Sequence, residues 1–136
     1  ILGLLWLILH VCRSLGIEPP MEPIQELLYF EDRFWLVALL VGLACVAGPI
    51  MEEILFRGVL FPAVRAHSSR LVAMLISGGI FSALHTNPIG FVPILVLGCL
   101  LADLYERTGS LISCISVHIV HNIFLMSFGL IMKALM

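Results

Sequence analysis

The chain has 136 residues, of which 61% are hydrophobic and only 12% are charged. Soluble domains are typically about 45–50% apolar and about 25% charged, so this composition indicates a membrane protein. The formal net charge of −2 and the lack of a basic run give no support for a nucleic-acid partner. The cysteines lie apart in apolar segments without a CxxC spacing, which favours small buried side chains over a disulfide or zinc framework. They are Cys12, Cys45, Cys99 and Cys114.

Five apolar stretches follow one another along the chain, and we expect each to be helical. The first is too short to span a bilayer, which takes about 20 residues. Because the chain also begins at Ile1 rather than at a methionine, we expect it to be a fragment of a larger bundle. The stretches are Ile1–Cys12, Phe34–Pro62, Leu71–Leu84, Ile89–Tyr105 and Ser110–Lys133.

A polar connector, Arg13–Arg33, separates the first two stretches, and its middle, Ile24–Phe30, is predicted to form a short interfacial helix. The second stretch is longer than a perpendicular span, so it should tilt, kink near Pro49 or emerge from the bilayer. We interpret residues 1–33 as a partial span plus connector and residues 34–136 as one catalytic membrane core. The predicted fold is an all-α, multi-pass transmembrane helical bundle with about four to five spans in this chain.

Basic residues in the connectors predict the orientation in the membrane. Only lysine and arginine count in the positive-inside rule, and the two sides carry equal numbers of them. Arg65, Arg70 and Arg107 lie in short loops close to the ends of the apolar stretches. We therefore expect their face to lie in the cytoplasm.

Three ionisable residues interrupt the second stretch after a run without any charge, from Phe34 to Met51. Glu53 and Arg57 are four residues apart with the acid first, the favoured helical orientation for an ion pair. Glu52 lies about 100° further round the helix, so it should project elsewhere, unpaired, as a candidate general base. Alternatively, both acids cap the end of a span and meet lipid headgroups.

Two later stretches contain further polar residues. His85 closes the third stretch on the same helical face as Phe81, either as an interfacial residue or as a catalyst. In the fifth, His118 and Asn122 lie one turn apart with His121 beside them. Lipid would penalise all three, so they should face the bundle interior. Hydrogen bonding between helices without any chemistry is the alternative.

Together these residues favour the activation of water. No serine or cysteine has a recognisable nucleophile elbow or partner, whereas a carboxylate and a histidine can polarise water, and histidine and asparagine can donate to an oxyanion. A zinc site is the rival, with Glu52, His85 and His118 as ligands, because zinc-bound water is a nucleophile near neutral pH. The HxxxH spacing of zincin helices is absent from the sequence, which makes the evidence for a metal weak.

Three short motifs resemble those of the CAAX protease and bacteriocin-processing family, also called the CPBP or Abi family. Each motif is weak alone, but their order and separations also match, and the ordered set is specific. The resemblance runs from about Phe34 to Phe128. The motifs are Glu52-Glu53-Ile-Leu-Phe-Arg57 for EExxxR, Phe81-Ser-Ala-Leu-His85 for FxxxH, and His118-Ile-Val-His121-Asn122 for HxxxN.

The resemblance implies a glutamate-dependent intramembrane endopeptidase that needs no cofactor. Glu52 would be the catalytic base, and His85 would help it to orient the water. His118 and Asn122 would stabilise the oxyanion. His121 falls on a variable position of the motif and receives no role. The supporting residues are Glu53, Arg57 and Phe81.

The resemblance leaves the substrate open beyond a peptide or protein, membrane-embedded or lipidated in some members. Some relatives process prenylated C-terminal tripeptides, and others cleave leader peptides or act in bacteriocin immunity. We expect an integral membrane protein of the bacterial plasma membrane rather than of the ER. Two alternatives remain: a non-catalytic membrane scaffold or bacteriocin-immunity protein, and a zinc-dependent membrane protease that uses the same residues.

Overall fold

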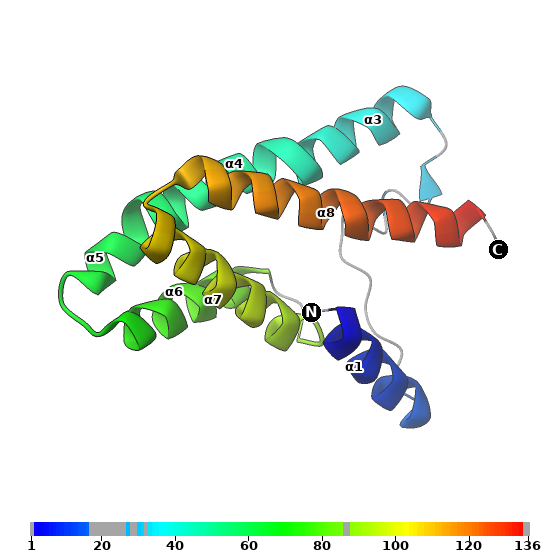
Figure 1. The fold of residues 1–136 in the computed structure, drawn as a ribbon. Coiled ribbons are helices and arrows are strands. Elements are labelled where there is room, and N and C mark those ends of the chain that lie inside the picture. The colour runs from blue at the N-terminus through cyan, green and yellow to red at the C-terminus, as the bar shows by residue number, and fades with distance from the viewer. Residues whose placement is uncertain (1, 17–26, 28–29, 32, 86–87, 135–136) are drawn as a thin grey trace.

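The computed structural model describes residues 2–16, 27, 30–31, 33–85 and 88–134, and all regular structure within these residues is helical (Figure 1). The first helix, α1, runs from Leu2 to Ser14 and corresponds to the first apolar stretch. The interfacial helix predicted for Ile24–Phe30 lies largely outside the described residues. The predicted all-α fold is confirmed.

The second apolar stretch forms one continuous helix of 32 residues, from Phe34 to Arg65. Two π-helical segments, in which hydrogen bonds join residues five apart, interrupt its α-helical geometry. Pro49 and Pro62 each lie directly after the first residue that follows a π segment. A wider turn thus precedes Pro49, where a kink was one of the three expectations for this stretch. The segments are α3 (Phe34–Gly42), η1 (Leu43–Ala47), α4 (Gly48–Glu53), η2 (Ile54–Leu60) and α5 (Phe61–Arg65).

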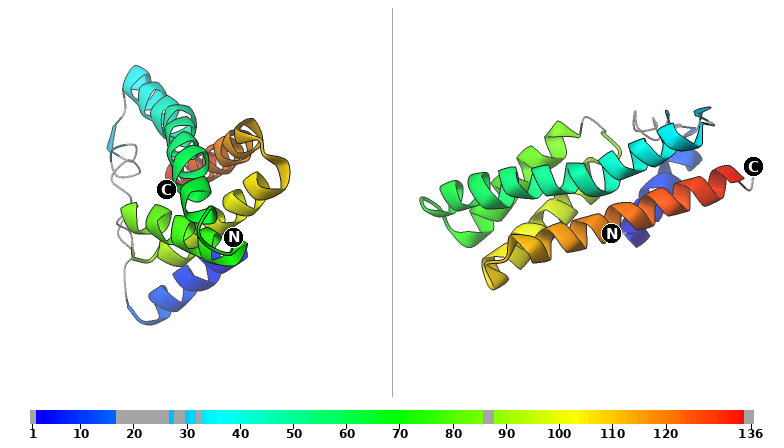
Figure 2. Two further views of the ribbon diagram at one scale, coloured as in Figure 1. Left: turned by 90° about the vertical axis from the view of Figure 1, so that its left-hand side faces the viewer. Right: turned by 90° about the horizontal axis from the view of Figure 1, so that it is seen from above.

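Three further helices pack against this long helix (Figures 1 and 2). The first, α6, spans Arg70–Leu84 and begins at an N-cap serine, Ser69, whose side chain accepts a hydrogen bond from the backbone N–H of Val72. The next, α7, spans Phe91–Thr108 and ends at a left-handed glycine, Gly109. The last, α8 (Leu111–Ala134), runs back along the long helix.

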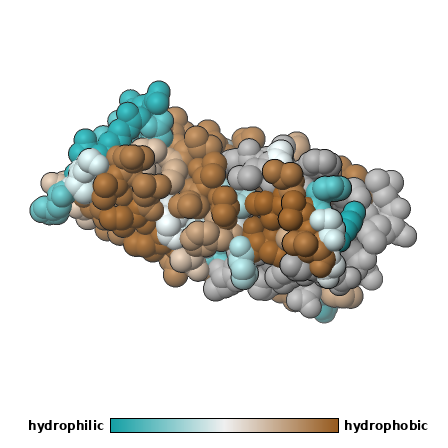
Figure 3. Space-filling view, turned by 90° about the horizontal axis from the view of Figure 1, so that it is seen from below, coloured by the Kyte–Doolittle hydropathy of each residue, from teal (hydrophilic) through white to brown (hydrophobic). Residues whose placement is uncertain are grey.

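Among the described residues, two helices are long and apolar enough to cross a membrane by length and composition: Phe34–Arg65 and Leu111–Phe128. Helix α6 is apolar but shorter. Many large apolar side chains on these helices are exposed, including Phe34, Leu55 and Val120. Figure 3 shows a broad hydrophobic face on the molecule, with hydrophilic residues gathered at the end where α5 meets α6. This pattern suits a surface in contact with lipid.

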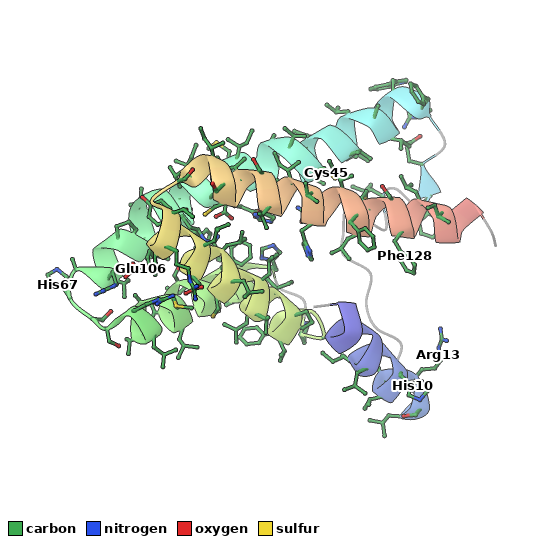
Figure 4. All side chains as sticks on the ribbon, viewed as in Figure 1. His10, Arg13, Cys45, His67, Glu106 and Phe128 are labelled. Carbon is green, nitrogen blue, oxygen red and sulfur yellow. The ribbon has the colours of Figure 1, made fainter. Side chains whose placement is uncertain are left out.

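The three arginines used to predict the orientation meet at this hydrophilic end, which Figure 4 marks with His67 and Glu106. Arg65 Nε donates to Glu106 over 2.9 Å, and Arg107 Nε lies 2.7 Å from Asp103, which also pairs with Arg70. Arg70 thus joins the start of α6 to α7, and Arg65 joins the end of α5 to α7. The cytoplasmic assignment of this end stays a prediction.

Helices α6 and α7 cross at two glycines. A Cβ atom added at Gly78 would lie 2.9 Å from Cys99 Sγ and 3.2 Å from Leu95 O. One added at Gly98 would lie 2.9 Å from the Gly78 Cα and 3.2 Å from Phe81 Cδ1. Small residues let helix backbones approach closely, and this approach brings the backbone of α7 next to the residues of the site.

We predict that Gly78→Ala lowers the free energy of unfolding by about 1–3 kcal/mol, because the new methyl group overpacks the crossing. Gly79→Ala is the matched control, since its Cβ would meet no atom within 4 Å. It should leave stability unchanged or raise it by up to about 1 kcal/mol, because alanine favours helices. Unfolding of both variants in detergent micelles checks this. Equal losses in the two would contradict the close crossing.

Candidate active site

A buried ion pair lies at the centre of the candidate site. Glu53 closes α4 and Arg57 follows in η2, and both side chains are fully buried. Arg57 Nη1 donates to Glu53 Oε1 over 2.8 Å. The structure therefore contains the ion pair that the four-residue spacing predicts.

Arg57 also contacts two other helices, α6 and α7. Its Nη2 donates to the backbone carbonyl of Gly98 in α7 over 2.8 Å. The guanidinium carbon lies 5.0 Å from the ring centroid of Phe81 in α6 and 5.8 Å from that of Phe56 in η2. The flat cation thus bonds in its plane and stacks on aromatic rings, which compensates part of its desolvation.

His118 of α8 reaches the same carboxylate. Its Nδ1 lies 2.8 Å from Glu53 Oε1, and its side chain is only 2% exposed. Because this oxygen already accepts a hydrogen bond from Arg57 Nη1, it is an acceptor, and Nδ1 of His118 is the donor of the second bond. This bond fixes the ring and directs Nε2 to the opposite side.

Glu52 lies where that second nitrogen points. Its Oε2 is 3.6 Å from His118 Nε2, and the side chain is 34% exposed. The prediction that Glu52 is unpaired is therefore wrong, because α8 brings a histidine within the range of an ion pair. A distance of 3.6 Å is nevertheless too long for a hydrogen bond, so the carboxylate keeps its lone pairs for another proton donor.

His85 stands at the end of α6 with its ring against Phe81. Its Nδ1 donates to the backbone carbonyl of Phe81 over 2.8 Å, and the two ring centroids are 4.7 Å apart. The ring of Phe81 also lies 5.8 Å from that of His118. Phe81 thus contacts both histidines. With Nδ1 donating, Nε2 of His85 carries a lone pair that can accept a proton.

Asn122 lies one turn beyond His118 on α8. Its Nδ2 donates to the backbone carbonyl of Ala44, in η1, over 3.0 Å. His121 beside it is partly buried. Three helices therefore contribute to one region: the long helix, α6 and α8.

Some contacts of this site were not predicted from the sequence. Gly98 and Ala44 contribute only backbone carbonyls, which no side-chain pattern reveals. Phe56 could have been noticed, because an aromatic side chain next to a buried arginine is a common partner for it.

Among the residues that the structure describes, no group of three or more histidine, cysteine, aspartate or glutamate side chains is arranged to hold a metal ion. The ligand set considered from the sequence was Glu52, His85 and His118. In the structure, Nδ1 of His85 bonds to a backbone carbonyl and Nδ1 of His118 bonds to Glu53, and the zinc site stays an alternative.

Comparisons with known proteins identify the family of this chain. The model of the family described as "Type II CAAX prenyl endopeptidase Rce1-like" matches residues 33–124, which include the three motifs. A protein of Bacillus subtilis (strain 168) named "Putative membrane peptidase YdiL" is 32% identical over 109 residues, covering 80% of this chain and 43% of the relative. The chain thus spans less than half the length of that relative. No solved structure matched significantly. By the family match and this relative, the chain belongs to the Rce1-like family of CAAX prenyl endopeptidases.

Proposed function

We propose that this chain is the catalytic core of a multi-pass membrane endopeptidase that hydrolyses peptide bonds with water activated by Glu52. One observation carries the proposal. The partly exposed carboxylate of Glu52 lies beside His118. The Nδ1 atom of this histidine is bonded to Glu53, which forms a buried ion pair with Arg57. Membership of a family of membrane proteases supports the same reaction class.

The two neighbouring acids have different roles in this proposal. Oε1 of Glu53 accepts from both Arg57 and His118, and its side chain is fully buried, so it has no access to a substrate. Glu52 is exposed enough to contact water. It accepts a proton as the water oxygen attacks the carbonyl carbon of the substrate, and His85 Nε2 accepts the hydrogen bond that orients this water.

The attack converts the substrate carbonyl into an oxyanion, which needs hydrogen-bond donors. Asn122 has a second N–H on Nδ2 besides the one that Ala44 accepts. His118 is the second donor in this proposal, through Nε2, which requires a proton on both ring nitrogens because Nδ1 already donates to Glu53. The proton on Glu52 then passes to the amide nitrogen of the leaving peptide as the C–N bond breaks.

The substrate is a peptide or protein that reaches the site from the membrane. The exposed apolar surface of the helices suits a bilayer, and lipidated or membrane-embedded substrates are compatible with it. The relative from Bacillus subtilis supports the bacterial plasma membrane as the location.

Substitution of Glu52 tests the reaction. Glu52→Gln removes the base at constant size and should lower kcat/KM for peptide cleavage by about 10²–10⁴-fold. Glu106→Gln, which removes a carboxylate of the surface ion pairs, should leave cleavage unchanged. The assay uses purified full-length protein in lipid vesicles. Full activity of Glu52→Gln would exclude the mechanism and leave the non-catalytic scaffold as the better description.

The buried ion pair makes a separate prediction about stability. Arg57→Ala leaves the buried carboxylate of Glu53 uncompensated and should lower the free energy of unfolding by about 3–5 kcal/mol. Arg65→Ala, which breaks a partly exposed pair with Glu106, should cost no more than about 1 kcal/mol. Unfolding in detergent compares the two variants. Similar losses would show that Arg57 is not a central contact.

Metal analysis separates the proposed mechanism from zinc-dependent hydrolysis. We propose that the reaction uses no metal, so protein purified with chelator and shown to be free of zinc should keep its full cleavage rate. Loss of the activity in that preparation, with recovery upon addition of zinc, would favour the zinc-dependent protease.

A further inference from the structure

The carbonyl group that holds Asn122 has lost its own helical donor. In a regular α-helix, the carbonyl of Ala44 would accept from the N–H of Gly48, four residues on. Here that N–H donates to the carbonyl of Leu43 instead, as the last bond of the π turn η1. The next nitrogen along the chain belongs to Pro49, which has no N–H. The carbonyl of Ala44 is thus left to the side chain of Asn122.

This bond determines how the Asn122 amide is oriented. A carbonyl oxygen can only accept, so it selects Nδ2 over Oδ1 and fixes which way the amide faces. One N–H of Nδ2 points to Ala44, and the second N–H is held in a defined direction. An oxyanion donor works by being oriented before the charge develops. The bond to the Ala44 carbonyl therefore matters for Asn122 in that role.

We propose that Pro49, together with the π turn before it, positions Asn122 for oxyanion stabilisation by supplying a free carbonyl acceptor. This inference rests on the proposed function of Asn122. It assigns to Pro49 a positioning role that acts through Asn122, with no contact to the substrate. The proline is fully buried next to the acids of the site, four residues before Glu53.

The chain offers a matched comparison in Pro62. This proline follows the second π turn, η2, as Pro49 follows the first, and the N–H of Phe61 donates to Phe56 just as that of Gly48 donates to Leu43. Both prolines therefore lie at the same kind of junction in the same helix. Asn122, however, bonds to the carbonyl freed at the first junction.

Peptide cleavage by full-length protein in lipid vesicles tests the proposal. Pro49→Ala restores an N–H that competes for the helical carbonyls, and we expect kcat to fall by about tenfold with little change in KM. Asn122→Ala should lower kcat by about 10²-fold, in the range for loss of one oxyanion donor. The double variant should be no slower than Asn122→Ala, because Pro49 acts only through Asn122. Pro62→Ala should keep the original kcat.

A spectroscopic measurement gives a result that does not depend on activity. With ¹⁵N-labelled asparagine, the side-chain amide signal of Asn122 is identified by its loss in Asn122→Ala. Its proton shifts should change in Pro49→Ala and stay constant in Pro62→Ala.

The outcomes separate this inference from the proposed function. An unchanged Asn122 signal in Pro49→Ala overturns the inference, as does an equal kcat loss in the two proline variants or a Pro49→Ala effect that multiplies with that of Asn122→Ala. An active Glu52→Gln variant would instead overturn the proposed function, while the amide signal would still report whether Pro49 holds Asn122.

Discussion

The buried pair of Glu53 and Arg57 is the interaction on which the rest of the structure depends. Two charges removed from water are stable only where hydrogen bonds and opposite charge compensate the loss of hydration. Arg57 obtains this from Glu53, from the Gly98 carbonyl and from the ring of Phe81, so it joins the long helix to both α6 and α7. Glu53 in turn bonds to His118, which connects α8 to the same group of helices. The approach of α6 and α7 at their glycines is what makes the Gly98 carbonyl reachable.

The same pair explains why two adjacent acids have different environments. A helix turns by about 100° per residue, so Glu52 and Glu53 cannot point in the same direction. Glu53 faces the packed interior, and Glu52 faces the partly exposed side. His118 connects them, because one imidazole nitrogen bonds to the buried acid and the other faces the exposed one. A buried charge pair thereby orients a histidine beside a partly exposed carboxylate.

The sequence predicted the contacts that lie within one helix. The Glu53–Arg57 pair and the shared face of Phe81 and His85 follow from the four-residue spacing, and the apolar stretches match the observed helices to within a few residues. Contacts between helices could not be predicted in the same way. The approach of Glu52 to His118 depends on how α8 packs, and the Asn122 bond depends on a carbonyl that every residue possesses. The two π turns were also missed, since proline predicts a kink without determining its form.

The π turn η1 gives a geometric reason why the carbonyl of Ala44 and the side chain of Glu52 both face α8. Eight residues of regular α-helix would separate their directions by about 80°, whereas a single extra residue in a wider turn reduces this difference to about 20°. Along the helix axis, carbonyl groups point toward the C-terminus and side chains lean toward the N-terminus. The Glu52 side chain accordingly leans back toward Gly48, where an added Cβ would lie 3.8 Å from Glu52 Oε1. In this way His118 and Asn122, only one turn apart on α8, face partners that are eight residues apart on the long helix.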